Sequence, residues 1–109
     1  MANIYRNAKV DFTTTDNTTV YTSPSNSRAI IKSILVSDDS GSGDSINVTL
    51  TDASAAVFSL FKTKAVSANG TEELISQPII LQESEILKAQ AKTAGRLHMV
   101  VSLLEINRD

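Results

Sequence analysis

The sequence predicts an all-β protein, a single-domain β-sandwich of about eight strands with a jelly-roll or Ig-like topology. The clearest observation is a pair of β-type runs, residues 29–37 and 45–51, on either side of a seven-residue linker without an apolar residue. That linker holds two glycines and three aspartates, which favours a turn. A second observation is the alternation of Ile46, Val48 and Leu50 with polar residues, which gives that strand one dry and one wet face. The rest of the chain repeats this pattern of short strands and turn signals.

Further strand-forming runs occur on both sides of this pair. Residues 3–13 alternate so that the apolar side chains share one face, and Arg6 is the exception on that face. Residues 18–23 form a short strand that ends at Pro24, because proline cannot donate to a ladder. The remaining predicted strands are residues 56–64, 71–76, 79–81, 85–91 and 96–107. We expect residues 1–17 to form an N-terminal strand or arm and residues 18–109 to form the sandwich, within one domain overall.

One segment has a helical alternative. Residues 84–95 begin with a Ser that could cap a helix, continue with good helix formers and end at Gly95. The surrounding β pattern, together with apolar residues on both faces at Ile86 and Leu87, favours a strand.

Two predicted strands have an apolar excess. In residues 29–36, strict alternation places Ile30, Ile34 and Val36 on one face and Ile31 and Leu35 on the other. Residues 96–106 are likewise apolar on both faces. One face of each strand fits the sandwich core, and the second face requires a cover. That cover is either a segment of the same chain, such as the N-terminal segment or a crossing loop, or another subunit.

Composition limits the classes of function. The chain has 109 residues, no cysteine and a net charge of −2, so we expect neither disulfides nor a thiolate metal site. Its ten Lys and Arg residues are scattered, which disfavours nucleic-acid binding. We expect no membrane span, because no apolar run approaches about 20 residues, and no secretory signal at the N-terminus. Cytoplasmic synthesis is the corresponding expectation.

No residue pattern indicates catalysis, a cofactor or a metal. Residues 38–44 mimic the first seven positions of a calcium loop, but Thr49 stands where the twelfth position requires a bidentate Glu. We therefore interpret them as a solvated turn. His98 is the only histidine and is expected to pack or to lie in an interface. We predict a protein that is not an enzyme.

Several residues are candidates for an interface instead. Phe58 and Phe61 fall on opposite faces of a regular strand, so one is a candidate anchor unless a bulge turns both inward. Glu105 follows an apolar run and could form an interface salt bridge. The full set of candidate interface residues is Ile4, Tyr5, Arg6, Phe58, Phe61, His98 and Glu105.

Six segments together resemble the small β-sandwich virion structural proteins of tailed bacteriophages, of the capsid decoration or cement type. The segments are residues 20–24, 29–36, 46–50, 71–74, 81–87 and 101–106. Glu83-Ser84 departs from the Gly-Asp turn usual before the penultimate strand of such proteins, and Ser37-Asp38 replaces the usual Asn after the strand that ends at Val36.

The resemblance implies a capsid decoration protein on the virion surface that binds the major capsid protein or another virion protein. It also implies a homo-oligomer, with a trimer favoured. We expect residues 1–6 to reach a neighbouring subunit. The alternatives are a neck, tail or fibre adaptor of the virion and a carbohydrate- or host-surface-binding module.

Overall fold

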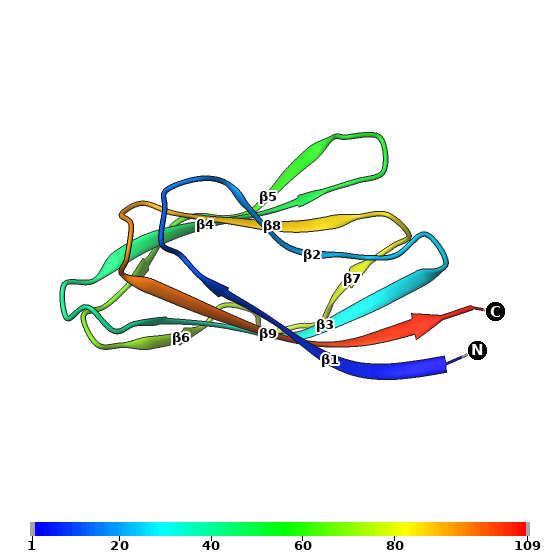
Figure 1. Ribbon diagram of the computed structural model, residues 1–109, viewed down its shortest axis with the longest axis horizontal. Helices are drawn as coiled ribbons and strands as arrows, with labels where there is room; N and C mark the ends of the chain where they lie inside the picture. The colour runs from blue at the N-terminus through cyan, green and yellow to red at the C-terminus, as the bar shows by residue number, and fades with distance from the viewer. Residues whose placement is uncertain (1, 109) are drawn as a thin grey trace.

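The computed structural model describes residues 2–108 and shows nine strands in two antiparallel sheets, with no helix in that range (Figure 1). The predicted all-β sandwich is confirmed. Residues 84–95, where a helix was the alternative, contain a strand and two turns. The strands are β1 (Ala2–Asp11), β2 (Thr18–Thr22), β3 (Ser27–Asp38), β4 (Asp44–Thr51), β5 (Val57–Val66), β6 (Thr71–Glu73), β7 (Ile79–Leu81), β8 (Ile86–Ala91) and β9 (Leu97–Asn107).

One sheet has five strands and the other has four. The five-stranded sheet runs β1-β9-β3, and β6 and β7 then lie end to end along the far side of β3. The four-stranded sheet runs β2-β8-β4-β5. Figure 1 shows the two layers stacked, with the hairpin of β4 and β5 projecting beyond the second layer. The free edges of the two sheets are therefore β1, the β6–β7 line, β2 and β5.

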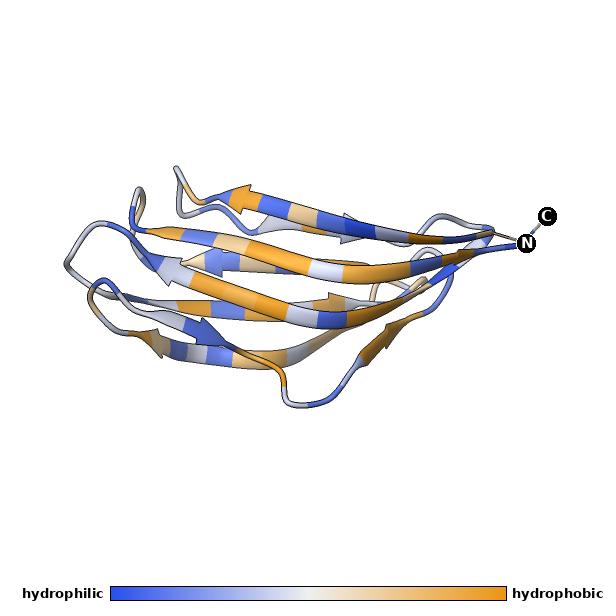
Figure 2. Cartoon of the chain, turned by 90° about the horizontal axis from the view of Figure 1, so that it is seen from below, coloured by the Kyte–Doolittle hydropathy of each residue, from blue (hydrophilic) through white to orange (hydrophobic). Residues whose placement is uncertain are grey.

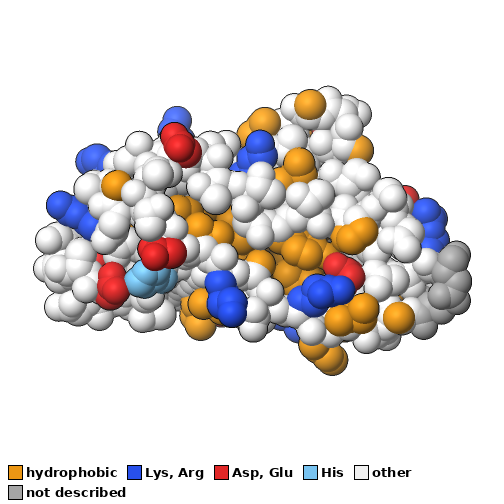
Figure 3. All heavy atoms as spheres, in the orientation of Figure 1, with side chains coloured by type: hydrophobic (Ala, Val, Ile, Leu, Met, Phe, Trp, Pro, Cys, Tyr) orange, Lys and Arg blue, Asp and Glu red, His pale blue; other side chains and the backbone are white. Residues whose placement is uncertain are grey.

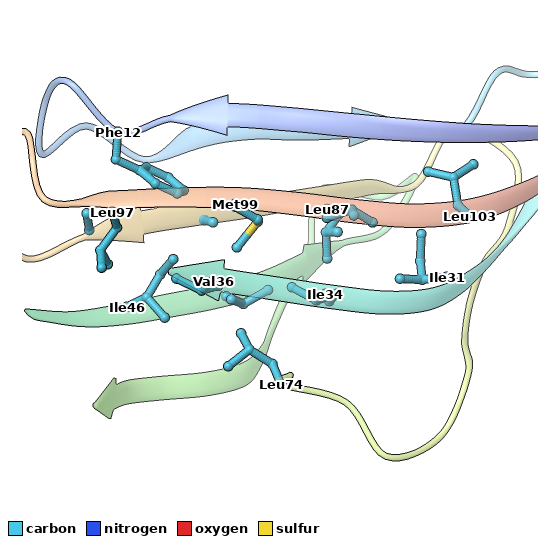
Figure 4. Close-up of a cluster of buried hydrophobic side chains, with 14 of the residues drawn as sticks. Phe12, Ile31, Ile34, Val36, Ile46, Leu74, Leu87, Leu97, Met99 and Leu103 are labelled. Atoms are coloured by element: carbon cyan, nitrogen blue, oxygen red, sulfur yellow. The ribbon is translucent and has the colours of Figure 1, made fainter. Parts of the chain in front are cut away.

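The core fills the space between the sheets. Alternate residues of β9 point inward, so Leu97, Met99, Val101 and Leu103 are buried, and β8 contributes Leu87 from the opposite sheet. Figure 4 shows Leu97, Met99 and Leu103 spaced along β9, with Phe12 close to Leu97 at one end. The alternation of hydrophobic and hydrophilic residues along the strands, visible in Figure 2, is the pattern expected where one face packs inside.

A bulge in β3 overturns one expectation about its faces. The register of β3 against β9 shifts between Ile31 and Ser33. The extra residue, Lys32, reverses the alternation, so Ile31 and Ile34 are both fully buried while Ile30 points outward. The prediction that Ile30 shares a face with Ile34 and Val36 was therefore wrong, because it assumed an unbroken strand.

The N-terminal segment is part of the sheet. Ala2 through Asp11 pair one to one with Asn107 through His98 of β9, without a break in register. Where the sequence led us to expect an arm reaching a neighbour, residues 2–6 instead pair within their own chain. Met1, the first residue of the expected arm, lies outside the described residues.

Candidate interaction surface

The outer face of the five-stranded sheet carries an apolar row across four strands. Tyr5 of β1 pairs with Leu104 of β9, Leu104 pairs with Ile30 of β3, and Ile30 pairs with Ile80 of β7. Paired residues of neighbouring strands point to the same side of a sheet, so these four side chains are neighbours. Tyr5 is 76% exposed and Ile80 is 60% exposed, so the two ends of the row face solvent.

A shorter apolar pair lies further along the same face. Leu35 of β3 pairs with Val100 of β9, and both are more than one third exposed. Ser33 and Ser102, also paired, separate this pair from the row. We call the set of Tyr5, Ile30, Leu35, Ile80, Val100 and Leu104 the apolar outer face.

No segment of residues 2–108 covers the apolar outer face. The N-terminal segment extends the sheet beside β9 and does not cross over it. The Lys32 side chain reaches over part of this face, since its Nζ lies 5.8 Å from the centroid of the Tyr5 ring. The sequence predicted a cover either by a segment of the same chain or by another subunit. The first is excluded for residues 2–108, and the second remains a proposal.

Glu105 lies on the other side of β9, inside the sandwich. It is only 4% exposed, and each of its carboxylate oxygens has a donor. Tyr21 Oη of β2 donates to Oε1 at 2.5 Å, and Arg6 Nε of β1 lies 3.2 Å from Oε2. Arg6, the exception on the inner face of its strand, is thus placed there by a buried carboxylate. Both residues, predicted as interface candidates, are engaged within the chain.

The surroundings of this cluster shift the pKa values of Glu105 and Tyr21 in opposite directions. Burial by itself would raise the pKa of Glu105, but the hydrogen bonds from Tyr21 and Arg6 outweigh it, and the pKa is lowered. Burial and the adjacent carboxylate raise the pKa of Tyr21. The cluster is therefore a carboxylate–phenol–guanidinium link between the two sheets.

His98 lies on the outer face of β9 between two carboxylates. Its Nε2 lies 3.1 Å from Asp11 and its Nδ1 lies 3.6 Å from Asp39. Figure 3 shows the histidine flanked by acidic side chains. Because the imidazole side chain is 42% exposed and no nucleophile is among these contacts, the arrangement is a surface contact of one imidazole with two carboxylates, at the far end of the apolar outer face.

The two phenylalanines of β5 lie on the same side of their sheet. Irregularities in the pairing of β4 with β5 place Phe61 opposite Val48 and Phe58 opposite Leu50, and Val48 and Leu50 both belong to the inward-facing side. Phe61 packs against the core, whereas Phe58, the second residue of β5 and close to the β4–β5 turn, is 54% exposed. Both phenylalanines therefore point to the inner side of the sheet, as the alternative with a bulge predicted, but only Phe61 is covered by the core.

Asp38 organises the loop that resembled a calcium site. Its Oδ1 accepts from the backbone and hydroxyl of Ser40, and its Oδ2 accepts from the backbone N–H groups of Gly43 and Asn69. These donors, led by the Ser40 hydroxyl, hold the pKa of Asp38 well below its usual range. The carboxylate is saturated by protein donors, which supports the interpretation as a turn.

The described part of the chain shows no cluster of three or more Asp, Glu, His or Cys residues positioned to hold a metal ion. A hollow at one end of the molecule is lined by Asn26, Arg28, Ile106 and the ion pair of Arg108 with Glu83, whose atoms are 2.8 Å apart. It contains no nucleophile with an adjacent base. Within residues 2–108, no helix is long and apolar enough to cross a membrane.

Comparison with known proteins shows similarity at the level of fold. The chain matches no protein-family model and no curated protein sequence. A solved chain from Bacillus endospore appendages, described as a novel family of disulfide-linked pili, aligns over 98% of this chain and 89% of that chain, with a TM-score of 0.57 and 8% identity. A pentameric capsid protein from metagenomic phage sequences aligns over 92% of this chain and 59% of that chain, with a TM-score of 0.46 and 15% identity. The first likeness establishes a shared sandwich architecture.

Proposed function

We propose that this protein is a structural subunit of a virus particle, of the capsid decoration type, and that it binds the assembled shell through the apolar outer face. The supporting observation is the row from Tyr5 to Ile80, which spans four strands and has no cover within residues 2–108. Exposed, contiguous apolar surface on a folded domain is typical of a protein–protein contact. We expect no catalytic activity.

The charged residues around the apolar outer face indicate which kind of partner surface would be complementary to it. Lys32 and Lys9 point outward beside the row, and Arg28 lies next to Ile30 on β3. Two acidic residues on the same sheet hydrogen-bond or contact groups of their own chain, since Glu73 accepts from Ser33 and from the backbone of Ile34, and Asp11 contacts His98. A partner surface with an apolar centre and a rim of Asp or Glu is therefore complementary.

A neck, tail or fibre adaptor is the second candidate. The observation that favours it is the shared architecture with a chain from an appendage made of pili. That chain's disulfide links have no counterpart here, because this chain has no cysteine. Both candidates are structural and use the same face, so they differ in the number of copies per particle and in their location.

Binding to purified shells tests the proposal. We expect the protein to sediment with shells that lack it, and Ile80→Lys to weaken that binding roughly tenfold or more by placing an ammonium group in a desolvated contact. The matched control is Val57→Lys on the projecting hairpin, since Val57 is 63% exposed, close to the 60% of Ile80. Equal binding of Ile80→Lys and the unmodified protein would reject the apolar outer face as the contact.

A further inference from the structure

The four sheet edges differ in how well they are protected from pairing with another strand. β2 has five residues and a register shift between Thr19 and Tyr21. β6 and β7 have three residues each and are separated by a segment that contains Pro78. β5 has two irregularities against β4 and carries Lys62 and Lys64. Short strands, bulges, prolines and lysines are the devices that prevent edge-to-edge association.

β1 has two of the devices that protect edges, Lys9 and the inward-pointing Arg6, and lacks the others. It has ten residues, contains neither Pro nor Gly, and pairs with β9 without any register shift. On its inner face, Ile4, Ala8 and Val10 are only partly buried. Figure 3, which looks at the edge formed by β1 and β2, shows hydrophobic side chains exposed between the sheets. A long, regular edge strand beside exposed apolar groups is a template for a further strand.

We propose that β1 pairs antiparallel with β1 of a second copy of this chain across a two-fold axis, with Asn7 opposite the second copy's Asn7. This register pairs nine of the ten residues of β1, Asn3 through Asp11, and forms about ten backbone hydrogen bonds. It places Ile4 opposite Val10 twice on the inner face and Tyr5 opposite Lys9 twice on the outer face. The two five-stranded sheets become one continuous sheet, and the apolar outer faces of the two copies lie side by side.

The charges of β1 favour this register over one centred on Arg6 or on Lys9. Centring the pair on Arg6 or on Lys9 would place that cation directly opposite its own copy, which is destabilising. Centring on Asn7 places Arg6 opposite Ala8 and Asp11 opposite Asn3, so no like charges face each other. The Tyr5–Lys9 pairs add a cation–π contact on each side of the axis. The strand is thus complementary to itself in a register that pairs nine of its ten residues.

This inference rests on the proposed function for its biological setting and makes the subunit a two-fold dimer, in place of the trimer that the family resemblance implies. Its test uses purified protein without particles, so its failure is separate from a failure of shell binding.

Single cysteines provide the experiment, because the native chain has none. In Asn7→Cys the two thiols face each other across the axis, within the range of a disulfide. In the matched control Asn3→Cys, on the same face of β1, the two sites are about 27 Å apart along the strands. Under mild oxidation we expect a covalent dimer from Asn7→Cys and monomer from Asn3→Cys. Failure of Asn7→Cys to cross-link, or equal cross-linking of both variants, overturns the proposal.

A charge swap gives a second, independent readout. Tyr5→Lys places an ammonium group opposite Lys9 twice, and we expect the dimer Kd measured by sedimentation equilibrium to rise roughly tenfold or more. Adding Lys9→Asp restores an attractive pair and should return the Kd to about its original value. A native chain that stays monomeric, or a double variant no tighter than Tyr5→Lys alone, contradicts the pairing.

Discussion

The Tyr21 hydroxyl donates a 2.5 Å hydrogen bond to Glu105 across the two sheets of the sandwich. Tyr21 belongs to β2 of the four-stranded sheet and Glu105 to β9 of the five-stranded sheet. Arg6 of β1 completes the cluster from the same sheet as Glu105. The sandwich is therefore joined near β1 and β2 by a polar link in addition to its apolar core.

Removing the Tyr21 hydroxyl should destabilise the fold. Tyr21→Phe leaves one oxygen of a nearly buried carboxylate without its donor, which costs about 1–3 kcal/mol. Chemical denaturation of both proteins measures the difference. Tyr5→Phe is the control, because the Tyr5 side chain is 76% exposed and its hydroxyl has no such partner among residues 2–108. An equal loss of stability in the control would contradict the role assigned to the Tyr21 hydroxyl.

Stability should fall in acid because of Glu105. Its folded pKa is lowered, so its contribution is fully present above the unfolded pKa of about 4.3 and is lost as pH falls through the folded pKa. Between about pH 5 and 3, Glu105→Gln should show a shallower decline in the free energy of unfolding than the native protein. Parallel curves would mean that the carboxylate does not titrate differently in the two states.

The Asp38 loop should lose order when its acceptor is removed. Asp38→Ala leaves the backbone N–H groups of Ser40, Gly43 and Asn69 without their shared acceptor. Hydrogen exchange at these amides should accelerate well above that of core amides such as Val101. Asp52→Ala, which removes a comparable acceptor from the exposed β4–β5 turn, should leave the Asp38 loop protected.

The two phenylalanines of β5 should respond differently to truncation. Phe61 packs against the core, so Phe61→Ala should cost about 2–4 kcal/mol. Phe58 is more than half exposed, and Phe58→Ala should cost less than about 1 kcal/mol. Thermal or denaturant unfolding distinguishes them, and similar losses for both variants would contradict the placement of Phe58 beyond the core.

Most of the fold follows from local patterns. The alternation in residues 45–51 predicts which side chains of β4 face the core, and the turn signals separate the nine strands of the structure. In residues 96–107 both faces are apolar, so the pattern predicts the strand but not which face is buried. The β3 bulge at Lys32 could not be predicted, because nothing in its local sequence marks an extra residue. Its backbone is stabilised by a distant group, since Glu73 binds Ser33 and the N–H of Ile34.

Less of the interaction surface and of the Glu105 cluster could be predicted from the sequence. Glu105 followed an apolar run and suggested an interface, yet its partner Tyr21 is 84 residues away, and only the pairing of sheets brings them together. The apolar excess of β9 was visible, and Arg6 was recognised as out of place in its strand. The link between Arg6 and Glu105 was missed, although each residue broke its own strand's pattern and the two could have been matched.

Particle composition tests the central claim, that this protein is a structural subunit of a virion. Particles purified from cultures that make the protein can be analysed by quantitative mass spectrometry and cryo-electron microscopy. We predict a copy number comparable to that of the major shell protein, with the apolar outer face against the capsid exterior. A single ring at the vertex or tail would favour the adaptor, and absence of the protein from the particle would contradict the claim.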